Sequence, residues 1–363
     1  MRRATIVAAV ICIGAWTAVS TVASQASTLA SRLGELRAQA AVPAVAGALF
    51  SSGAITDVAV SGVRKEGDPA PATTDDLWHI GSITKSFTSL LVAKQVDRGA
   101  MAWSSTLAEL FGAERAGAFG PVTLLQLLGH RAGLPANVGP GMMPKVAEGS
   151  PTVVLQRQRL VDASFAGTPA AAPGAAFVYS NLGYVIAGAL LEARAGKPWE
   201  ELVQTDVLAP LSLRSAGQGP PGEAGVLSQP RGHRRGANGV LIPVEPGVGA
   251  DNPPYLGPAG RLHMTVSDLA RWGQAHLKGE RGVDGLVKAD TFRRLHQAQG
   301  PDGYASGWVS QVTADRRVIW HNGSNTLWYA IVAFDPVADR GVALVSNGGI
   351  GAAKVIDAAA MAA

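Results

Sequence analysis

The chain has 363 residues, of which 47% are hydrophobic and 16% are charged, so the composition excludes an intrinsically disordered protein. The formal net charge of +4 is too small and too scattered to indicate a nucleic-acid-binding protein. Cys12 is the only cysteine, which excludes a disulfide framework and a cysteine-based metal cluster. At roughly 150 residues per domain, the length predicts a folded, enzyme-sized chain with two lobes.

The first 24 residues have the pattern of a secretory signal peptide. Two arginines precede an almost wholly apolar run over residues 4–19, and the small residues 22–24 offer a cleavage site. The alternative is an uncleaved membrane anchor, because the segment up to residue 23 could just span a bilayer. We expect cleavage, and therefore an exported protein, periplasmic or secreted and free of the membrane, made of residues 25–363.

Predicted strands stand at both ends of the remaining chain, with predicted helices between them. Helices are predicted over 29–40, 82–97, 123–128, 181–195 and 199–207, from Thr265 onward with Asp268 completing a capping box, and over 352–362. Strands are predicted over 45–50, 55–60, 307–312, 318–321, 328–334 and 342–346. This order predicts an α+β fold, in which N- and C-terminal strands form one antiparallel sheet flanked by helices. We place the sheet lobe at about 29–78 and 257–363, and an inserted, mainly helical lobe at about 79–256.

Residues 217–260 are rich in glycine and proline and contain no predicted element. So long an irregular stretch inside a compact domain usually has a function or forms a lid. The basic run 231–235 within it is predicted to be a solvated loop, with a contact to a cell-wall polymer as the alternative. Three tryptophans, Trp272, Trp308 and Trp328, are expected in the core.

A Ser-x-x-Lys pattern, Ser82 to Lys85, lies at the start of a predicted helix. Residues three apart share a helix face, so the serine hydroxyl and the lysine amine can meet. A serine is a weak nucleophile until a base takes its proton, and a buried lysine can serve because desolvation lowers its pKa. The alternative for so short a pattern is a capped helix with an exposed lysine. Apolar neighbours on both sides favour the reactive pair.

A second pair of polar side chains, Tyr179 and Asn181, comes directly before and at the start of the predicted helix 181–195. On a loop tip, the phenol could relay a proton, and the amide could orient the lysine or bind a substrate carbonyl. The alternative is that Asn181 caps the helix behind a core tyrosine.

The third element is His321, which Gly323 and Ser324 follow at the end of a predicted strand. The glycine would let a substrate lie close against the strand, and the next N–H could face an oxyanion. The alternative for His321 is a strand-end histidine bound to the backbone. Because the seven histidines show no paired helical spacing, we expect no metal, and no cofactor is indicated.

The order Ser-x-x-Lys, Tyr-x-Asn and His-x-Gly resembles the serine β-lactamase and penicillin-binding-protein superfamily. Tyr-Ser-Asn at 179–181 is similar to its class C-related branch, which comprises class C β-lactamases, D-aminopeptidases and carboxypeptidases, and family VIII esterases. Residues 127–135 resemble the family's Leu-Leu-x-His-x-x-Gly-Leu-Pro segment, and residues 257–262 resemble its Pro-Ala-Gly-Gly-Leu turn. The resemblance covers nearly all of residues 29–350 and implies a β-lactamase/transpeptidase-like fold.

The resemblance also implies a role for each polar residue of the site. Ser82 would be the acylated nucleophile and Lys85 its proton acceptor. Tyr179 would shuttle protons to the leaving group and activate the deacylating water. Asn181 would hold Lys85 and the substrate amide, and the N–H groups of Ser82 and Ser324 would form the oxyanion hole.

His321 departs from the class C β-lactamases, which carry Lys-Thr-Gly where this chain has His-Asn-Gly. A lysine is charged and pairs with the carboxylate of a β-lactam, whereas a histidine is largely neutral at pH 7. We expect His321 and Gly323 to line the substrate site. Because a histidine stands there in place of the charged lysine, efficient β-lactam hydrolysis is not expected to be the main activity. If His321 titrates as an ordinary histidine, acidification to about pH 5.5 should make it cationic and favour carboxylate-bearing substrates.

These patterns predict an exported serine hydrolase that cleaves an ester or amide through an acyl-enzyme on Ser82. The substrate would be a small molecule or a peptide: a small ester, a D-amino-acid peptide or a β-lactam. The alternative is a penicillin-binding sensor or a cell-wall-associated binding protein with little turnover. Tyr179 favours the enzyme, because a sensor needs no deacylation device. No nucleic acid or membrane partner is indicated, and the number of subunits stays open.

Overall fold

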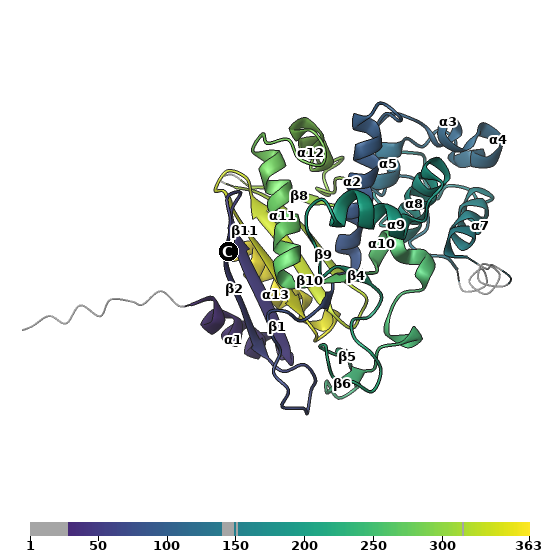
Figure 1. Cartoon of the computed structure of the whole chain (residues 1–363). Coiled ribbons are helices and arrows are strands. Elements are labelled where there is room, and N and C mark those ends of the chain that lie inside the picture. Colours follow the sequence, from purple (N-terminus) through teal and green to yellow (C-terminus); the bar gives the residue numbers. More distant parts are fainter. Residues whose placement is uncertain (1–27, 140–148, 150–151, 314–315) are drawn as a thin grey trace, which may run out of the picture.

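The computed structural model describes residues 28–139, 149, 152–313 and 316–363 (Figure 1). The predicted signal peptide, residues 1–24, lies outside this range, so its cleavage stays a prediction, as do the limits of the two lobes. Within the described part of the chain, no helix combines the length and the apolar character needed to cross a membrane.

A six-stranded antiparallel sheet in the order β2-β1-β11-β10-β9-β8 contains strands from both ends of the chain. The strands are β1 (Ala44–Phe50), β2 (Ile55–Gly62), β8 (Val309–Val312), β9 (Arg317–Ser324), β10 (Tyr329–Asp335) and β11 (Arg340–Ser346). The N-terminal β1 pairs with the C-terminal β11, with Val45 opposite Ser346 and Phe50 opposite Gly341. The predicted α+β class is confirmed, and the six predicted strands are present with ends shifted by a few residues.

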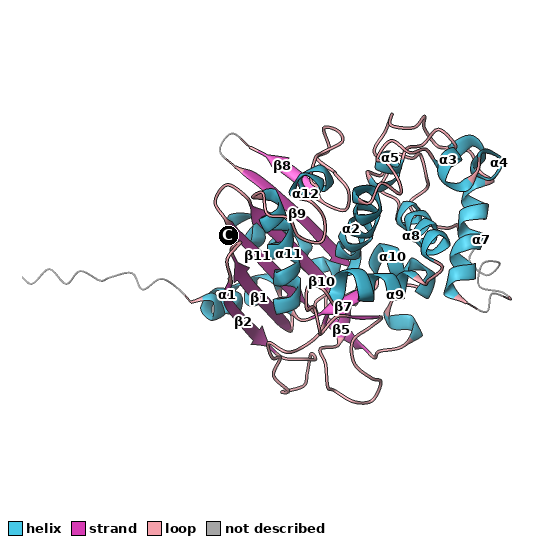
Figure 2. Cartoon of the chain, turned by 45° about the horizontal axis from the view of Figure 1, so that its top comes forward, coloured by secondary structure: helices cyan, strands magenta, loops and turns pink. Residues whose placement is uncertain are grey.

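Helices cover both faces of the sheet (Figures 1 and 2). One face packs against α1 (Leu29–Ala40) and α13 (Ala353–Ala362), and the other packs against α11 (Val266–Glu280). Alternate residues of a strand point to opposite faces, so along β10 Ile331 joins the first layer and Val332 joins the second. With both faces buried, the central strands are apolar along most of their length.

The remaining helices lie mainly beside the sheet (Figure 2). They are α2 (Thr84–Asp97), α3 (Leu107–Phe111), α4 (Ala113–Ala116), α5 (Leu124–Leu128), α7 (Val153–Phe165), α8 (Asn181–Ala195), α9 (Trp199–Val203), α10 (Gly257–Gly260) and α12 (Ala289–Leu295). The helix predicted over 199–207 ends as α9 and continues as a π-helical turn, η3 (Gln204–Leu208). At α11 the predicted capping box is half present, because Thr265 Oγ1 accepts from the Asp268 N–H while the Asp268 carboxylate binds Ser215 instead.

Residues 217–260 are folded, so the prediction that they form an irregular stretch is wrong. They contain β4 (Gly217–Gln218), β5 (Gly232–Arg235), β6 (Leu241–Val244), η4 (Val248–Ala250), η5 (Pro254–Leu256) and α10. Strand β5 pairs with β6, and β7 (Leu262–Met264) pairs with β4 and with β3 (Trp78–His79). Strands of two to four residues are too short to show a hydrophobic period, so pattern analysis missed them.

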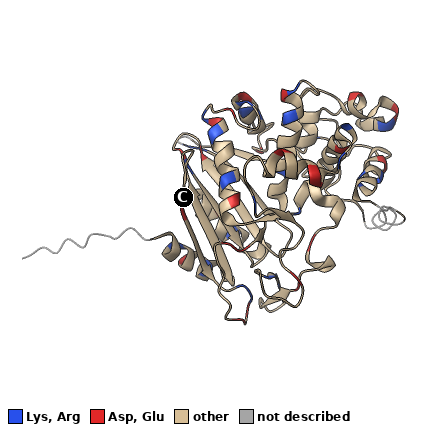
Figure 3. Ribbon diagram, in the orientation of Figure 1, with Lys and Arg blue, Asp and Glu red and all other residues tan. Residues whose placement is uncertain are grey.

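The basic run 231–235 is also not a loop, because it leads into β5, and of its charged residues only Arg234 and Arg235 are exposed. Arg231 is buried, donates to the carbonyls of Glu223 and Val226, and lies 3.0 Å from Glu245. His233 is buried, with Nδ1 2.8 Å from the Asn347 carbonyl. Elsewhere, Lys and Arg are interspersed with Asp and Glu over the helices (Figure 3). The three expected core tryptophans are fully buried.

Candidate active site

The predicted nucleophile lies on a tight turn between β3 and α2. This turn is η1 (Gly81–Ile83), and Ser82 within it is half-buried, so its hydroxyl is accessible. Gly81 has a φ of +49°, and a Cβ there would lie 2.2 Å from the Ser324 backbone nitrogen. Only glycine fits both the dihedral and the close approach of β9, so the sequence around Ser82 is adapted to contact with that strand.

Lys85 is fully buried on the first turn of α2, so the alternative of an exposed lysine is wrong. Its Nζ lies 3.0 Å from Ser82 Oγ, 2.7 Å from Asn181 Oδ1 and 2.8 Å from the Ala259 carbonyl. Burial lowers the pKa of Lys85 well below its ordinary value. A neutral amine has two hydrogens for the two carbonyl oxygens and one lone pair, which is left for the Ser82 hydroxyl. This arrangement suits a proton acceptor.

Asn181 binds the lysine and does not cap its helix. The N-cap of α8 is Ser180, whose Oγ accepts from the Gly183 N–H at 3.3 Å, so the predicted Asn181 cap is wrong. A cap at Ser180 leaves the Asn181 amide free to accept from Lys85 and to donate to Asn137 Oδ1 at 2.8 Å. The position directly after the cap therefore points the amide into the site.

Tyr179 precedes this cap and reaches the nucleophile. Burial raises the pKa of the Tyr179 phenol above its ordinary value, and a hydrogen bond with Ser82 partly offsets this effect. The phenol therefore stays protonated at neutral pH. Lys85 Nζ lies 4.8 Å from the centre of the Tyr179 ring, where the ring face favours any positive charge that the amine acquires.

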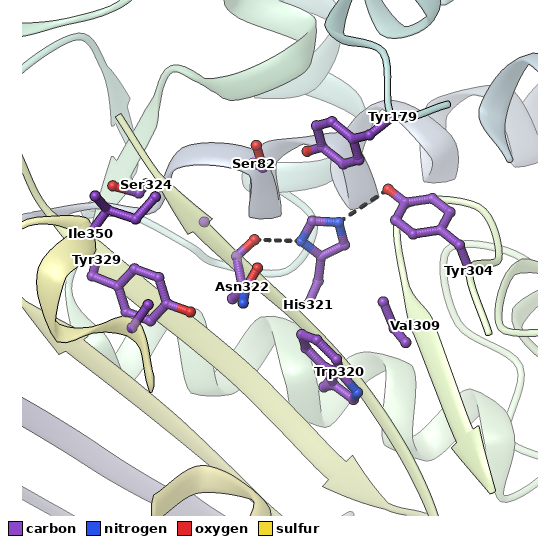
Figure 4. A pocket seen from close by; sticks show the side chains of 12 residues that line it. Ser82, Tyr179, Tyr304, Val309, Trp320, His321, Asn322, Ser324, Tyr329 and Ile350 are labelled. Carbon is purple, nitrogen blue, oxygen red and sulfur yellow. Dashed lines mark hydrogen bonds between the residues drawn. The ribbon is translucent and has the colours of Figure 1, made fainter. Parts of the chain in front are cut away.

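His321 on β9 is held by two hydrogen bonds, which Figure 4 shows. Nδ1 lies 2.5 Å from the Asn322 carbonyl and must donate to it, so Nε2 accepts from the Tyr304 hydroxyl at 3.1 Å. The alternative of a backbone-bound histidine is thus confirmed for Nδ1, although His321 lies within β9 and not at its end, and its ring also lines the site. Burial, and then the nearby Lys85, lowers the pKa of His321 to about 3. The expectation that it becomes cationic near pH 5.5 is therefore wrong.

Gly323 and Ser324 bring the end of β9 against the turn that carries Ser82. A Cβ on Gly323 would lie 2.1 Å from the Ile80 carbonyl oxygen and 2.5 Å from the Ser82 backbone nitrogen. Likewise, a Cβ on Gly81 would lie 2.2 Å from the Ser324 backbone nitrogen. The backbone N–H groups of the strand and of the turn therefore meet at one junction. Two such N–H groups beside a nucleophile can stabilise the oxyanion of a tetrahedral intermediate.

A pocket of about 360 Å³ opens over these groups (Figure 4). It is lined by Ser82, Tyr179, Tyr304, Val309, Trp320, His321, Asn322, Gly323, Ser324, Tyr329, Ile350 and Ala353. Five of the seven predicted site residues line it, and the other two, Lys85 and Asn181, contact each other behind Ser82. No lining residue carries a formal charge at neutral pH, so the pocket holds no cation that could pair with a substrate carboxylate.

Two residues of the site were missed from the sequence. Tyr304 lies in the loop before β8, and burial raises its pKa well above the ordinary value, so it remains a donor to His321. His130 has a φ of +59°, accepts from the Ser180 N–H at 3.0 Å, and packs its ring 4.2 Å from that of Tyr179. The motif at 127–135 contained His130, but no pattern near Tyr304 indicated its function.

Comparisons with known proteins point to one family. A family model described as Beta-lactamase matches residues 29–363. Penicillin-binding protein 4 of Amycolatopsis lactamdurans is 26% identical over 335 residues, which are 88% of this chain and 84% of that protein. A Beta-lactamase of Escherichia coli (strain K12) is 30% identical over 210 residues, which are 57% of this chain and 50% of that protein. The match therefore spans half of the length of the Escherichia coli protein.

A solved structure has the same fold. The D-amino acid amidase from Ochrobactrum anthropi SV3, complexed with L-phenylalanine, superposes with a TM-score of 0.70 at 24% identity, covering 88% of this chain and 90% of that one. At this identity the similarity concerns the fold alone, and it confirms the predicted architecture.

Proposed function

This chain belongs to the Beta-lactamase family, and from that premise we propose that it is an exported serine hydrolase acting through an acyl-enzyme on Ser82. One observation carries the proposal: the buried Lys85 amine, 3.0 Å from Ser82 Oγ, is directed by two carbonyl oxygens. Among the described residues, no carboxylate contacts this amine to hold it in the charged form. A lysine so placed has little structural purpose, because burying an amine without an ionic partner destabilises the fold.

In the proposed acylation, Ser82 passes its proton to Lys85 as Oγ bonds to the substrate carbonyl carbon. The N–H groups of Ser82 and Ser324 stabilise the oxyanion, and Tyr179 protonates the leaving group as its bond breaks. The resulting phenolate then takes a proton from water, and the hydroxide attacks the acyl-enzyme. Ser82 leaves with the proton that Lys85 held, so each group returns to its starting state.

The pocket offers no ionic partner to a substrate carboxylate. His321 is uncharged at physiological pH because its pKa is about 3, and the apolar side chains of Val309, Trp320 and Ile350 line the same cavity. A substrate carboxylate would lose hydration there without gaining an ionic partner. We therefore propose that small esters and amides, including D-amino-acid amides of the kind named for the structural relative, are better substrates than β-lactams.

A substrate panel tests the function. We expect the protein lacking residues 1–24 to hydrolyse p-nitrophenyl butyrate or D-phenylalanine amide with a higher kcat/KM than nitrocefin. If the protein hydrolyses no member of the panel, the proposed function is contradicted.

A penicillin-binding sensor is the second candidate, supported by the similarity to Penicillin-binding protein 4. Incubation with a fluorescent penicillin separates the two. A sensor stays labelled for hours, whereas an enzyme with the proposed deacylation step loses the label and recovers its esterase activity.

We expect Tyr179→Phe to lower kcat about 10²-fold for p-nitrophenyl butyrate, and further for D-phenylalanine amide. The variant loses the hydroxyl that is proposed to protonate the leaving group. Nitrophenolate departs without a proton, whereas an amine does not, so the amide depends more on the phenol. Steady-state kinetics with both substrates check this, and an equal loss for the two would argue that Tyr179 does not act on the leaving group.

His321 gives a prediction about specificity. We expect the ratio of kcat/KM for nitrocefin to that for p-nitrophenyl butyrate to stay constant from pH 5.5 to 8, since a histidine with a pKa of about 3 does not titrate there. We expect His321→Lys to raise this ratio about tenfold, because a charge-assisted hydrogen bond to a carboxylate is about twice as strong as a neutral one. A ratio that rises on acidification in the wild type, or stays unchanged in the variant, would contradict this reading of His321.

A further inference from the structure

Asp251 lies in the segment 217–260, next to the site but outside its pocket. Its side chain is 3% exposed. Oδ1 lies 2.8 Å from His79 Nε2 and accepts from Asn325 Nδ2 at 3.1 Å, while Oδ2 accepts from Arg261 Nε at 3.0 Å. This one buried carboxylate thus joins three segments that are distant in the sequence.

Through His79, Asp251 is connected to the turn that carries the nucleophile. His79 is fully buried, and its Nδ1 accepts from the Gly81 N–H at 3.1 Å. Nδ1 therefore has no hydrogen, and Nε2 carries the ring hydrogen on the side of Asp251. Gly81 directly precedes Ser82, so the imidazole is bonded to the backbone next to the Ser82 N–H.

Through Asn325, Asp251 is connected to the end of β9. Asn325, 7% exposed, directly follows Ser324, and its Oδ1 accepts from the N–H groups of Leu327 and Trp328 at 3.2 and 3.3 Å. The turn that it closes contains Thr326 at a φ of +78°, a strained conformation for a β-branched residue. The side chains of Asn325 and Ser324 both bond to the backbone of this turn, Ser324 Oγ accepting from the Thr326 N–H at 2.8 Å.

We propose that Asp251 is a positioning residue that fixes the spacing of the two oxyanion-hole donors, the N–H groups of Ser82 and Ser324. This inference rests on the proposed function. Such donors must lie within about 0.5 Å of their productive positions, and the loss of a whole donor costs about 10²–10³ in kcat. Loosening both without removing either should therefore cost about 10–100-fold.

The test compares Asp251→Asn with a control, Asp335→Asn. The Asp335 side chain is similarly buried, at 4% exposed, and accepts from the N–H groups of Val337 and Ala338 and from Arg316, but it lies at the far end of β10. For each protein we would measure kcat and KM for p-nitrophenyl butyrate, the inhibition constant of phenylboronic acid, which forms a tetrahedral adduct with a nucleophilic serine, and Tm.

We expect Asp251→Asn to lower kcat about 10–100-fold with KM little changed, and to weaken boronate inhibition by a similar factor. Asp335→Asn should lower Tm and leave both kinetic constants near those of the wild type. The inference is overturned if Asp251→Asn keeps the wild-type kcat and boronate affinity, or if the control shows the same loss.

A second variant keeps the test decisive if Asp251→Asn does not fold. In His79→Asn the shorter amide can still accept from Gly81 but cannot reach Asp251, and we expect a loss of kcat in the same range. A wild-type kcat in that variant would also overturn the inference. A wild-type protein that neither hydrolyses the ester nor binds the boronate would instead refute the proposed function, so the two failures are distinguishable.

Discussion

Replacing Ser82 by alanine is expected to abolish hydrolysis of every substrate in the panel, with a loss on the order of 10⁶ in kcat. The hydroxyl carries the covalent step, and neither Lys85 nor Tyr179 can act without it. Because Ser82 is half-buried in η1 and alanine removes only the hydroxyl that bonds to Lys85 and Tyr179, the variant should fold with a Tm near that of the wild type.

The control for this variant is Ser164→Ala. Ser164 lies on α7, and its hydroxyl donates to the Leu160 carbonyl of the same helix at 2.7 Å. Ser164 is not among the residues that line the pocket. It should keep full activity. Near-native activity in Ser82→Ala would show that the nucleophile lies elsewhere.

The second large effect is expected at Lys85. We expect Lys85→Arg to lose on the order of 10²–10⁴ in kcat, although it keeps a positive charge, because a guanidinium is protonated at all accessible pH values and offers no lone pair. The wild type should lose activity as the pH falls through the lowered pKa of Lys85, since only the neutral amine accepts the Ser82 proton.

Lys94→Arg is the matched control on the same helix. Lys94 lies 3.6 Å from Asp206, a pairing that arginine can keep, and the variant should show wild-type kcat. If Lys85→Arg is as active as Lys94→Arg, the amine serves as a fixed cation and not as a base.

Short-range relations made much of the site predictable. Ser82 and Lys85 are one helical turn apart, so their contact follows from helix geometry. The pairing of N- and C-terminal strands followed from their position at both ends of the chain. The assembly of Asn181 and His321 around Ser82 came from the resemblance, because no local pattern places residues about 100 and 240 positions away.

Other features depend on contacts between residues that no sequence pattern indicates. The ring of Tyr304 reaches His321 across a loop, and Asp251 reaches His79 over 172 positions, so both are visible only after folding. The neutrality of His321 at pH 7 was predicted correctly, but its low pKa depends on complete burial, which a strand-end position does not reveal. The folded state of 217–260 was missed for a related reason, since its short strands depend on pairing with partners that lie elsewhere in the chain, as β4 does with β7.

The central claim is that Ser82 forms a covalent intermediate, and labelling with a fluorophosphonate tests it most directly. A nucleophilic serine displaces fluoride from this reagent and keeps the phosphonyl group. Trypsin should release residues 66–85 as one peptide, in which Ser82 is the only serine. The account predicts that this peptide gains the phosphonyl mass in the wild type and not in Ser82→Ala. An adduct on the peptide 160–194 or 318–340, with 66–85 unmodified, would contradict it.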